Sequence, residues 1–332
     1  MNSARVLAML ALSIPTLSLA QNLYETVLLD SSASRRTTRP VIRGRHYAVS
    51  SMEPLATKAA ERILNSGGNA FDAAVGGQAV LGLVAPASNG MGGDAVLLVF
   101  DAASKKAVSI NAEGAAPKLA TIDWYKKNHN GKLPVDETLL AGTVPGVPDA
   151  WYILLDRWGT KSFAEVLEPA IELAGNGFPA TESFARSVSG SRKLGKFPSS
   201  VKLYQPDGKG PVAGALWRNP SLARTMKRMV EAERRHLPQG RRAALRAARD
   251  EFYKGAIAQE MAHFSAENGG LFRYEDFADY AAKVEAPVST DYRGYTVYKN
   301  ASANQGPAEL FTLNLLEGFD LKSLGHNSAE YI

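Results

Sequence analysis

Few residues of this sequence have the types and spacing of a conventional catalytic or metal site. Cysteine is absent, which excludes disulfides, cysteine-ligated zinc, iron–sulfur clusters and thiol catalysis. The sequence has no Gly-x-Ser-x-Gly elbow, no phosphate-binding Gly-Lys-Ser/Thr loop and no His-Glu-x-x-His pair. We therefore expect no metal and no organic cofactor. The five histidines share no metal-ligand spacing: His46, His129, His236, His263 and His326.

A glycine-rich run, Gly90-Met-Gly-Gly93, resembles half of a dinucleotide-binding loop. It precedes a predicted strand at 95–100, whereas a dinucleotide loop opens a helix, so this interpretation fails on context. A basic segment at 224–249 contains several arginines, but acidic neighbours partly neutralise it and no aromatic rings interleave. A solvated helical face is favoured there, and we expect no nucleic-acid partner.

The elements around the glycine-rich run have clear local signals. Pro54 begins a predicted helix that Gly67-Gly68 closes, and Asn69 caps a second, apolar helix at 70–84. Three glycines inside that second helix indicate close approach to another element. A fully buried strand is expected at 95–100, with a return strand at 107–110 after a hairpin turn.

Further helices are predicted at 146–158, 162–176 and 221–262. Residues 189–216 are rich in glycine, proline and serine and are expected to form a long surface loop. A single strand is expected at 290–298.

Composition and the N-terminus bound the class of protein. The chain has 332 residues with 45% hydrophobic and 21% charged residues and a net charge of +5, so a disordered chain is excluded. Residues 1–20 have a short basic start, an apolar core and a small-residue cleavage site, which together indicate a secretory signal peptide. The alternative, a membrane anchor, is disfavoured because the apolar stretch is short and Pro15 interrupts it. A polar leader follows at 21–44, and the main region is 45–332.

Residues 326–332 provide an N-cap and then only the first turn of a helix. Because so short a helix is unstable alone, we expect the chain to be an N-terminal part of a longer protein.

Several motifs, in order, resemble the gamma-glutamyltranspeptidase family. The resemblance covers about residues 46–332, and the ordered set is far more specific than any one motif. The motifs are Gly67-Gly-Asn-Ala-Phe-Asp-Ala-Ala74, Asn89-Gly-Met-Gly-Gly93, Thr143-Val-Pro-Gly-Val147, Glu168-Pro-Ala-Ile-Glu-Leu-Ala174, Glu251-Phe-Tyr-Lys-Gly255, Asn268-Gly-Gly270 and Tyr292-Arg-Gly-Tyr295.

This resemblance implies an α+β fold, the αββα sandwich of N-terminal-nucleophile hydrolases, here without the small-subunit strands. It implies a gamma-glutamyl transferase or glutathione hydrolase that acts through a threonine acyl-enzyme, made as a precursor that cleaves itself. The partners implied are the small subunit of the same precursor and a small gamma-glutamyl or other amide. We expect a secreted, periplasmic protein.

The resemblance places the nucleophile after residue 332, so we expect no catalytic residue in this chain and an inactive fragment. Of the threonines weighed for this role, Thr37 and Thr38 lie in the leader, and seven others fall in or beside predicted helices, turns and strands. These seven are Thr57, Thr121, Thr143, Thr160, Thr181, Thr290 and Thr296.

Glu113 is the one candidate substrate-binding residue. Family members carry an arginine that pairs with the α-carboxylate of the glutamyl group, and Glu113 occupies the matching position here. Glu113 would repel a carboxylate, and either faces a cationic or neutral group or is a solvated turn residue. Two alternatives therefore stay open: an acylase or amidohydrolase of a different amide, such as oxamate or an acylated amine, and a non-catalytic secreted scaffold.

Overall fold

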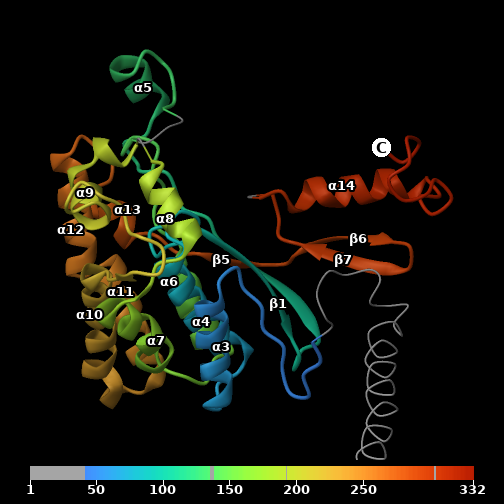
Figure 1. The fold of residues 1–332 in the computed structure, drawn as a ribbon, viewed down its shortest axis with the longest axis horizontal. Coiled ribbons are helices and arrows are strands. Elements are labelled where there is room, and N and C mark those ends of the chain that lie inside the picture. The colour runs from blue at the N-terminus through green and yellow to red at the C-terminus, as the bar shows by residue number, and fades with distance from the viewer. Residues whose placement is uncertain (1–41, 135–137, 192, 303) are drawn as a thin grey trace, which may run out of the picture. The chain divides into compact units, whose positions relative to one another are not determined.

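The computed structural model describes residues 42–134, 138–191, 193–302 and 304–332. The chain divides into two compact units, 1–49 and 50–332, and the second contains all of the helices and strands described below (Figure 1). The predicted signal peptide at 1–20 lies outside the described residues, as does the leader at 21–44 except for its last three residues.

Two helices, α3 (Pro54–Asn65) and α4 (Ala70–Val84), form the predicted helical hairpin. Pro54 occupies the first turn of α3, and Asn69 caps α4 by accepting hydrogen bonds from the N–H groups of Phe71 and Asp72. The glycines of α4 allow the close contacts that the sequence indicates. A Cβ at Gly76 would overlap the Ile63 side chain of α3.

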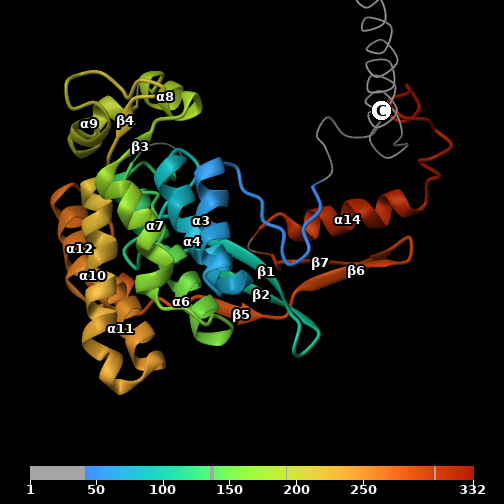
Figure 2. The ribbon, with the colours of Figure 1, turned by 60° about the horizontal axis from the view of Figure 1, so that its bottom comes forward.

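The main sheet has three antiparallel strands in the order β1-β2-β5: β1 (Ala95–Asp101), β2 (Lys106–Ala112) and β5 (Lys283–Glu285). The predicted hairpin between β1 and β2 is confirmed. The prediction that the first strand is fully buried is wrong, because β1 alternates in exposure and Val96, Leu98 and Phe100 are exposed. In the described residues β1 is an edge strand, and the helices gather on one side of the sheet (Figure 2).

The helices form two packed groups. α6 (Val147–Arg157) packs on β2, and α7 (Phe163–Asn176) packs on α4. A second group packs against them: α10 (Pro220–His236), α11 (Arg241–Tyr253) and α12 (Ala256–Glu267). The predicted helical segment at 221–262 is therefore three helices. Gly240, at φ +95°, separates the first two, so the basic segment 224–249 is not one helix.

Residues 178–217 form a small aromatic substructure. It contains β3 (Phe178–Pro179), α8 (Glu182–Ser189), a 3₁₀ turn (Leu194–Lys196), α9 (Pro198–Tyr204) and β4 (Leu216–Trp217). The prediction of a long surface loop at 189–216 is wrong in part. Tyr204 stacks on Trp217 at 5.7 Å between ring centroids, and this packing stabilises a helix that local composition disfavours.

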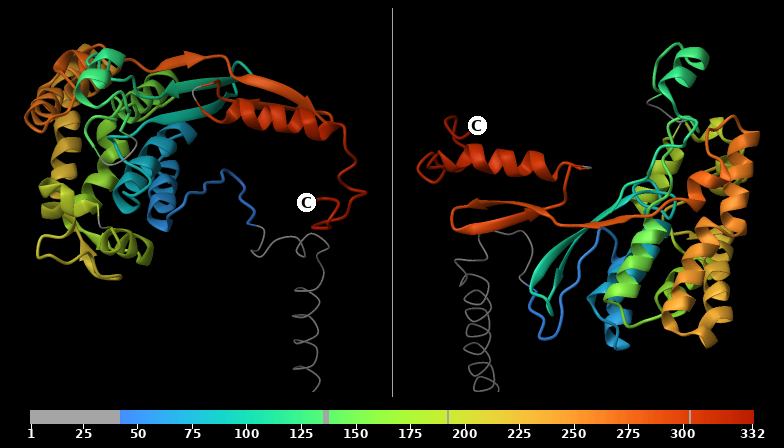
Figure 3. Two further views of the ribbon diagram at one scale, coloured as in Figure 1. Left: turned by 90° about the horizontal axis from the view of Figure 1, so that it is seen from above. Right: turned by 180° about the vertical axis from the view of Figure 1, so that it is seen from behind.

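The C-terminal part contains α13 (Tyr274–Ala278), β6 (Val288–Tyr292), β7 (Tyr295–Lys299) and α14 (Gly306–Glu317). The single strand expected at 290–298 is instead a hairpin. Arg293 and Gly294 form its turn, both with positive φ. Helix α14 packs on this hairpin (Figure 3). A remaining short helix, α5, spans Ile122–Asn128.

Candidate active site

The glycine-rich turn lies against the end of α4. Ala85 is the C-cap residue of α4. Its carbonyl accepts hydrogen bonds from the N–H groups of Ser88 and Asn89. Gly82 and Gly90 touch: a Cβ on Gly82 would lie 3.2 Å from the Gly90 Cα. The backbone of the turn therefore approaches the helix more closely than side chains would permit.

The same turn is bound to the start of α6. The N–H groups of Gly146 and Val147 donate to the Gly93 carbonyl at 2.8 and 3.2 Å. Gly146 also lies against the end of β2, where a Cβ would overlap the Ala112 carbonyl. Three segments that are distant in sequence thus converge: the turn at 89–94, the end of β2 at 112–115, and residues 143–147.

Two carboxyl groups meet at this convergence. The register of the hairpin pairs Ala95 with Ala112, so Asp94 and Glu113 occupy the next opposed positions. The carboxyl groups of Asp94 and Glu113 are in contact, and this contact between two acids, together with burial, raises the pKa of Glu113. Glu113 therefore retains its proton to a higher pH than an isolated glutamate.

The backbone of Glu113 is fixed from both sides. Its N–H donates to Asn111 Oδ1 at 3.1 Å, and its carbonyl accepts from the Tyr280 hydroxyl at 3.1 Å. Tyr280 in turn stacks on Tyr253, with 5.5 Å between ring centroids. Glu113 consequently projects from a rigid frame.

A buried ion pair supports that frame. Arg249 Nε donates to Asp149 Oδ1 at 2.7 Å, and Arg249 Nη2 donates to the Tyr280 carbonyl at 2.5 Å. Both charged side chains are less than 10% exposed. Asp149 also accepts from the N–H of Ala282 at 2.6 Å, so the pair joins α6, α11 and the segment that precedes β5.

A cavity of about 350 Å³ opens on the glycine-rich turn. Its lining combines backbone of the turn with polar side chains, and Asp94 is the only charged residue among them. The lining residues are Gln78, Ser88, Asn89, Gly90, Gly92, Gly93, Asp94 and Val147. A site of this kind can hold a small polar molecule against exposed peptide groups and the carboxyl group of Asp94, which contacts Glu113 beside the cavity.

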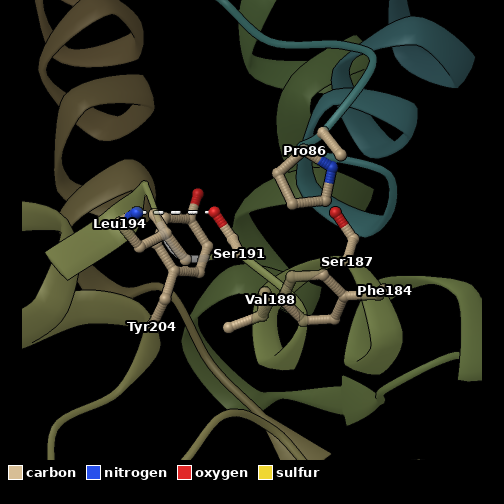
Figure 4. Close-up of a pocket in the computed structure, with 8 residues that line it drawn as sticks. Pro86, Phe184, Ser187, Val188, Ser191, Leu194 and Tyr204 are labelled. Carbon is tan, nitrogen blue, oxygen red and sulfur yellow. Dashed lines mark hydrogen bonds between the residues drawn. The ribbon is translucent and has the colours of Figure 1, made fainter. Parts of the chain in front are cut away.

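A second cavity of about 220 Å³ begins where the same loop leaves α4. Pro86 forms one wall, and Phe184 and Val188 of α8 form another, with Tyr204 and Leu194 beyond (Figure 4). Two serine hydroxyls, of Ser187 and Ser191, supply its polar groups. This cavity suits a small, partly apolar group.

Six of the seven threonines named above have structural hydrogen bonds. Thr121 and Thr181 cap α5 and α8, and Thr160 donates its hydroxyl to buried Asp72. The Thr57 hydroxyl donates to the Glu53 carbonyl. Thr290 bonds to the Asn314 side chain, and Thr296 bonds to the Asp291 side chain. Among the described residues, no group of three or more His, Asp or Glu side chains is placed to hold a metal ion.

Sequence reasoning identified the turn and Glu113 but missed Asp94, Tyr280 and the pair of Asp149 and Arg249. Asp94 carried one usable signal, since it directly precedes a strand whose hairpin partner ends at residue 112. The contacts of Tyr280 with Glu113 and of Arg249 with Asp149 span 167 and 100 residues of sequence, and no local pattern indicates such contacts.

The mixed fold, in which helices cover an antiparallel sheet with a glycine-rich turn at its edge, is shared with solved structures of N-terminal-nucleophile hydrolases. The match to the model of the family described as gamma-glutamyltranspeptidase covers residues 56–332, and the chain belongs to this family. The fold expected from the sequence, α+β of the αββα type, is thereby confirmed.

Individual proteins of known sequence or structure are also similar to this chain. The chain is 36% identical to the glutathione hydrolase-like YwrD proenzyme of Bacillus subtilis over 89% of this chain and 52% of that protein. It resembles the crystal structure of Helicobacter pylori gamma-glutamyltranspeptidase, with a TM-score of 0.78, 27% identity and coverage of 87% and 80%. It also resembles a cephalosporin acylase from Bacillus halodurans, with a TM-score of 0.71, 31% identity and coverage of 87% and 52%. The chain spans about half the length of the curated relatives that it matches.

Proposed function

We propose that this chain is the large-subunit part of an amidohydrolase or acyltransferase that acts on gamma-glutamyl amides and similar amides whose acyl group carries an ammonium. The observation that supports this most is the carboxyl pair of Asp94 and Glu113 beside the cavity of the glycine-rich turn. Family membership supplies the reaction class.

The reaction follows the family's acyl transfer. A threonine hydroxyl outside the printed 332 residues attacks the amide carbonyl carbon, the C–N bond breaks, and the threonine proton passes to the leaving amine. Water then attacks the threonine ester, which releases the acid and restores the hydroxyl, or an acceptor amine takes the acyl group instead. Six of the seven threonines named in the sequence analysis have structural hydrogen bonds, which supports a nucleophile elsewhere.

The charge expected of the substrate's acyl group follows from the acidic pair of Asp94 and Glu113. An arginine would bind a carboxylate, but Asp94 and Glu113 repel one and attract an ammonium. The α-ammonium of a gamma-glutamyl group and a simple amino-acyl group both satisfy this requirement. Binding of a cation would favour the ionised form of Glu113, because its carboxylate then has a positive partner.

An acylase of a different amide is the second candidate. The observations that favour it are Glu113 at the position of the expected arginine and the likeness to a protein described as a cephalosporin acylase. The second cavity, lined by Phe184 and Val188, would then accommodate a less polar group.

The partner in this proposal is a small subunit of the same precursor, and the protein acts after secretion to the periplasm. Relatives are described as proenzymes. The exposed side chains Val96, Leu98 and Phe100 on β1 would be covered by that partner. No helix among the described residues is long and apolar enough to cross a membrane.

The test uses the protein made from the complete reading frame. Two bands on a denaturing gel and amine release from a gamma-glutamyl anilide would support the proposal. Release from neutral acyl anilides alone would favour the acylase. A single band with no release from either substrate class would contradict catalysis and favour the scaffold.

A further inference from the structure

A polar cavity of about 500 Å³ lies between α6, α11 and the segment 278–284. Its wall is mostly made of charged and tyrosine side chains. The cations on the wall are Arg157, Arg246, Arg249 and Lys254, and the acids are Asp149, Asp156 and Asp279.

Each acid of this wall already has a cationic partner. Asp149 binds buried Arg249, and Asp156 accepts from Arg242 at 3.0 Å. Asp279 binds Lys118. Two of these partners lie outside the lining, so the acids do not neutralise the remaining cations of the cavity.

Arg246 is held in place without being neutralised. Its Nη2 donates to the Tyr152 hydroxyl at 2.8 Å, and its guanidinium lies 5.3 Å from the centroid of that ring. Burial is the largest of the effects that raise the pKa of Tyr152, so the phenol stays neutral. A guanidinium fixed by a neutral partner keeps most of its donors for a ligand.

Two further cations are available. Arg157 forms no ion pair among the described residues and lies 6.0 Å from the Trp158 ring centroid. Lys254 has only a 3.9 Å contact with Asp250, which also binds Arg249 at 3.0 Å. Both cations lie at helix C-termini, and each terminus contributes about half a negative charge. With these two termini and the Asp250 carboxylate counted, the three cations Arg157, Arg246 and Lys254 retain an excess of about one positive charge.

We propose that this cavity binds a small multivalent oxyanion, with Arg157, Arg246 and Lys254 as its ligands. Guanidinium groups match the planar, bidentate geometry of phosphate and carboxylate oxygens, and an ammonium adds a point charge. Phosphate esters and polycarboxylates share this chemistry.

Titration calorimetry of the full chain with pyrophosphate, and separately with citrate, at constant ionic strength tests the proposal. We expect saturable binding of at least one of them with one site per chain. The anion that binds more tightly shows whether the natural ligand is a phosphate ester or a polycarboxylate. The double variant Arg157→Gln/Arg246→Gln should weaken binding at least tenfold.

The matched control is Arg234→Gln/Arg235→Gln on α10, which removes the same charge from exposed positions outside the cavity. It should change the dissociation constant less than twofold. Since Arg157 and Arg246 are both exposed, the variants should unfold at the wild-type temperature, and the single Arg246→Gln variant provides a second measurement. Absence of saturable binding by both anions, or equal weakening in both double variants, would overturn the proposal.

Discussion

Asp94 and Glu113 occupy opposed positions at the open end of the β1–β2 hairpin, and the contact of their carboxyl groups raises the pKa of Glu113. The glycine-rich turn orients the first, and the bond from the Tyr280 hydroxyl to the Glu113 carbonyl orients the second. The pair therefore connects the turn, the sheet edge and the buried frame behind it.

The carboxyl pair should make stability depend on pH. The raised pKa of Glu113 means that the folded state binds more protons than the unfolded state above the ordinary value of 4.5. Stability should fall as pH rises through the raised pKa. Glu113→Gln removes this loss, so its unfolding temperature relative to wild type should increase with pH. Glu317→Gln on exposed α14 is the control, and a constant difference for Glu113→Gln across this range would contradict the assignment.

The convergence of the three segments should tolerate no side chain at Gly146. Gly146→Ala forces a Cβ into the Ala112 carbonyl and should destabilise the fold by about 1–3 kcal/mol. Gly175→Ala in α7 meets nothing within 4 Å and should stabilise it by up to about 1 kcal/mol. Denaturant unfolding of both variants measures this, and equal effects would show that the contact is not rigid.

The buried ion pair should be costly to break from one side. Arg249→Met leaves the Asp149 carboxylate buried without its cation and should cost about 3–5 kcal/mol of unfolding free energy. Adding Asp149→Asn should recover part of this loss. By contrast, Arg62→Gln breaks pairs whose side chains are about half exposed, and should cost no more than about 1 kcal/mol. Similar losses for Arg249→Met and Arg62→Gln would contradict the supporting role.

Local sequence signals predicted the elements whose ends are set by residues adjacent in sequence. The helix at 70–84 is correct at both ends, and Asn69 sets its start by capping it with its own side chain. The turn of the β6–β7 hairpin was missed because Arg293, a residue that rarely adopts positive φ, occupies its first position.

Features that depend on packing between segments distant in sequence could not be predicted from local signals. Helix α9 forms where Tyr204 meets Trp217, and the pairing of Asp94 with Glu113 follows from strand register rather than from either local sequence. The resemblance identified the family and the position of Glu113, but gave neither its carboxyl partner nor the Tyr280 contact.

The most direct test of the central claim uses three anilides that differ only in charge: gamma-glutamyl, 4-aminobutyryl, which lacks the α-carboxylate, and glutaryl, which lacks the ammonium. The protein from the complete reading frame should turn over both ammonium-bearing substrates with a kcat/KM at least tenfold above glutaryl anilide. Glu113→Gln should reduce that ratio mainly through KM, because a binding interaction is lost. If glutaryl anilide is preferred, or the ratio is unchanged in Glu113→Gln, the carboxyl pair does not recognise an ammonium.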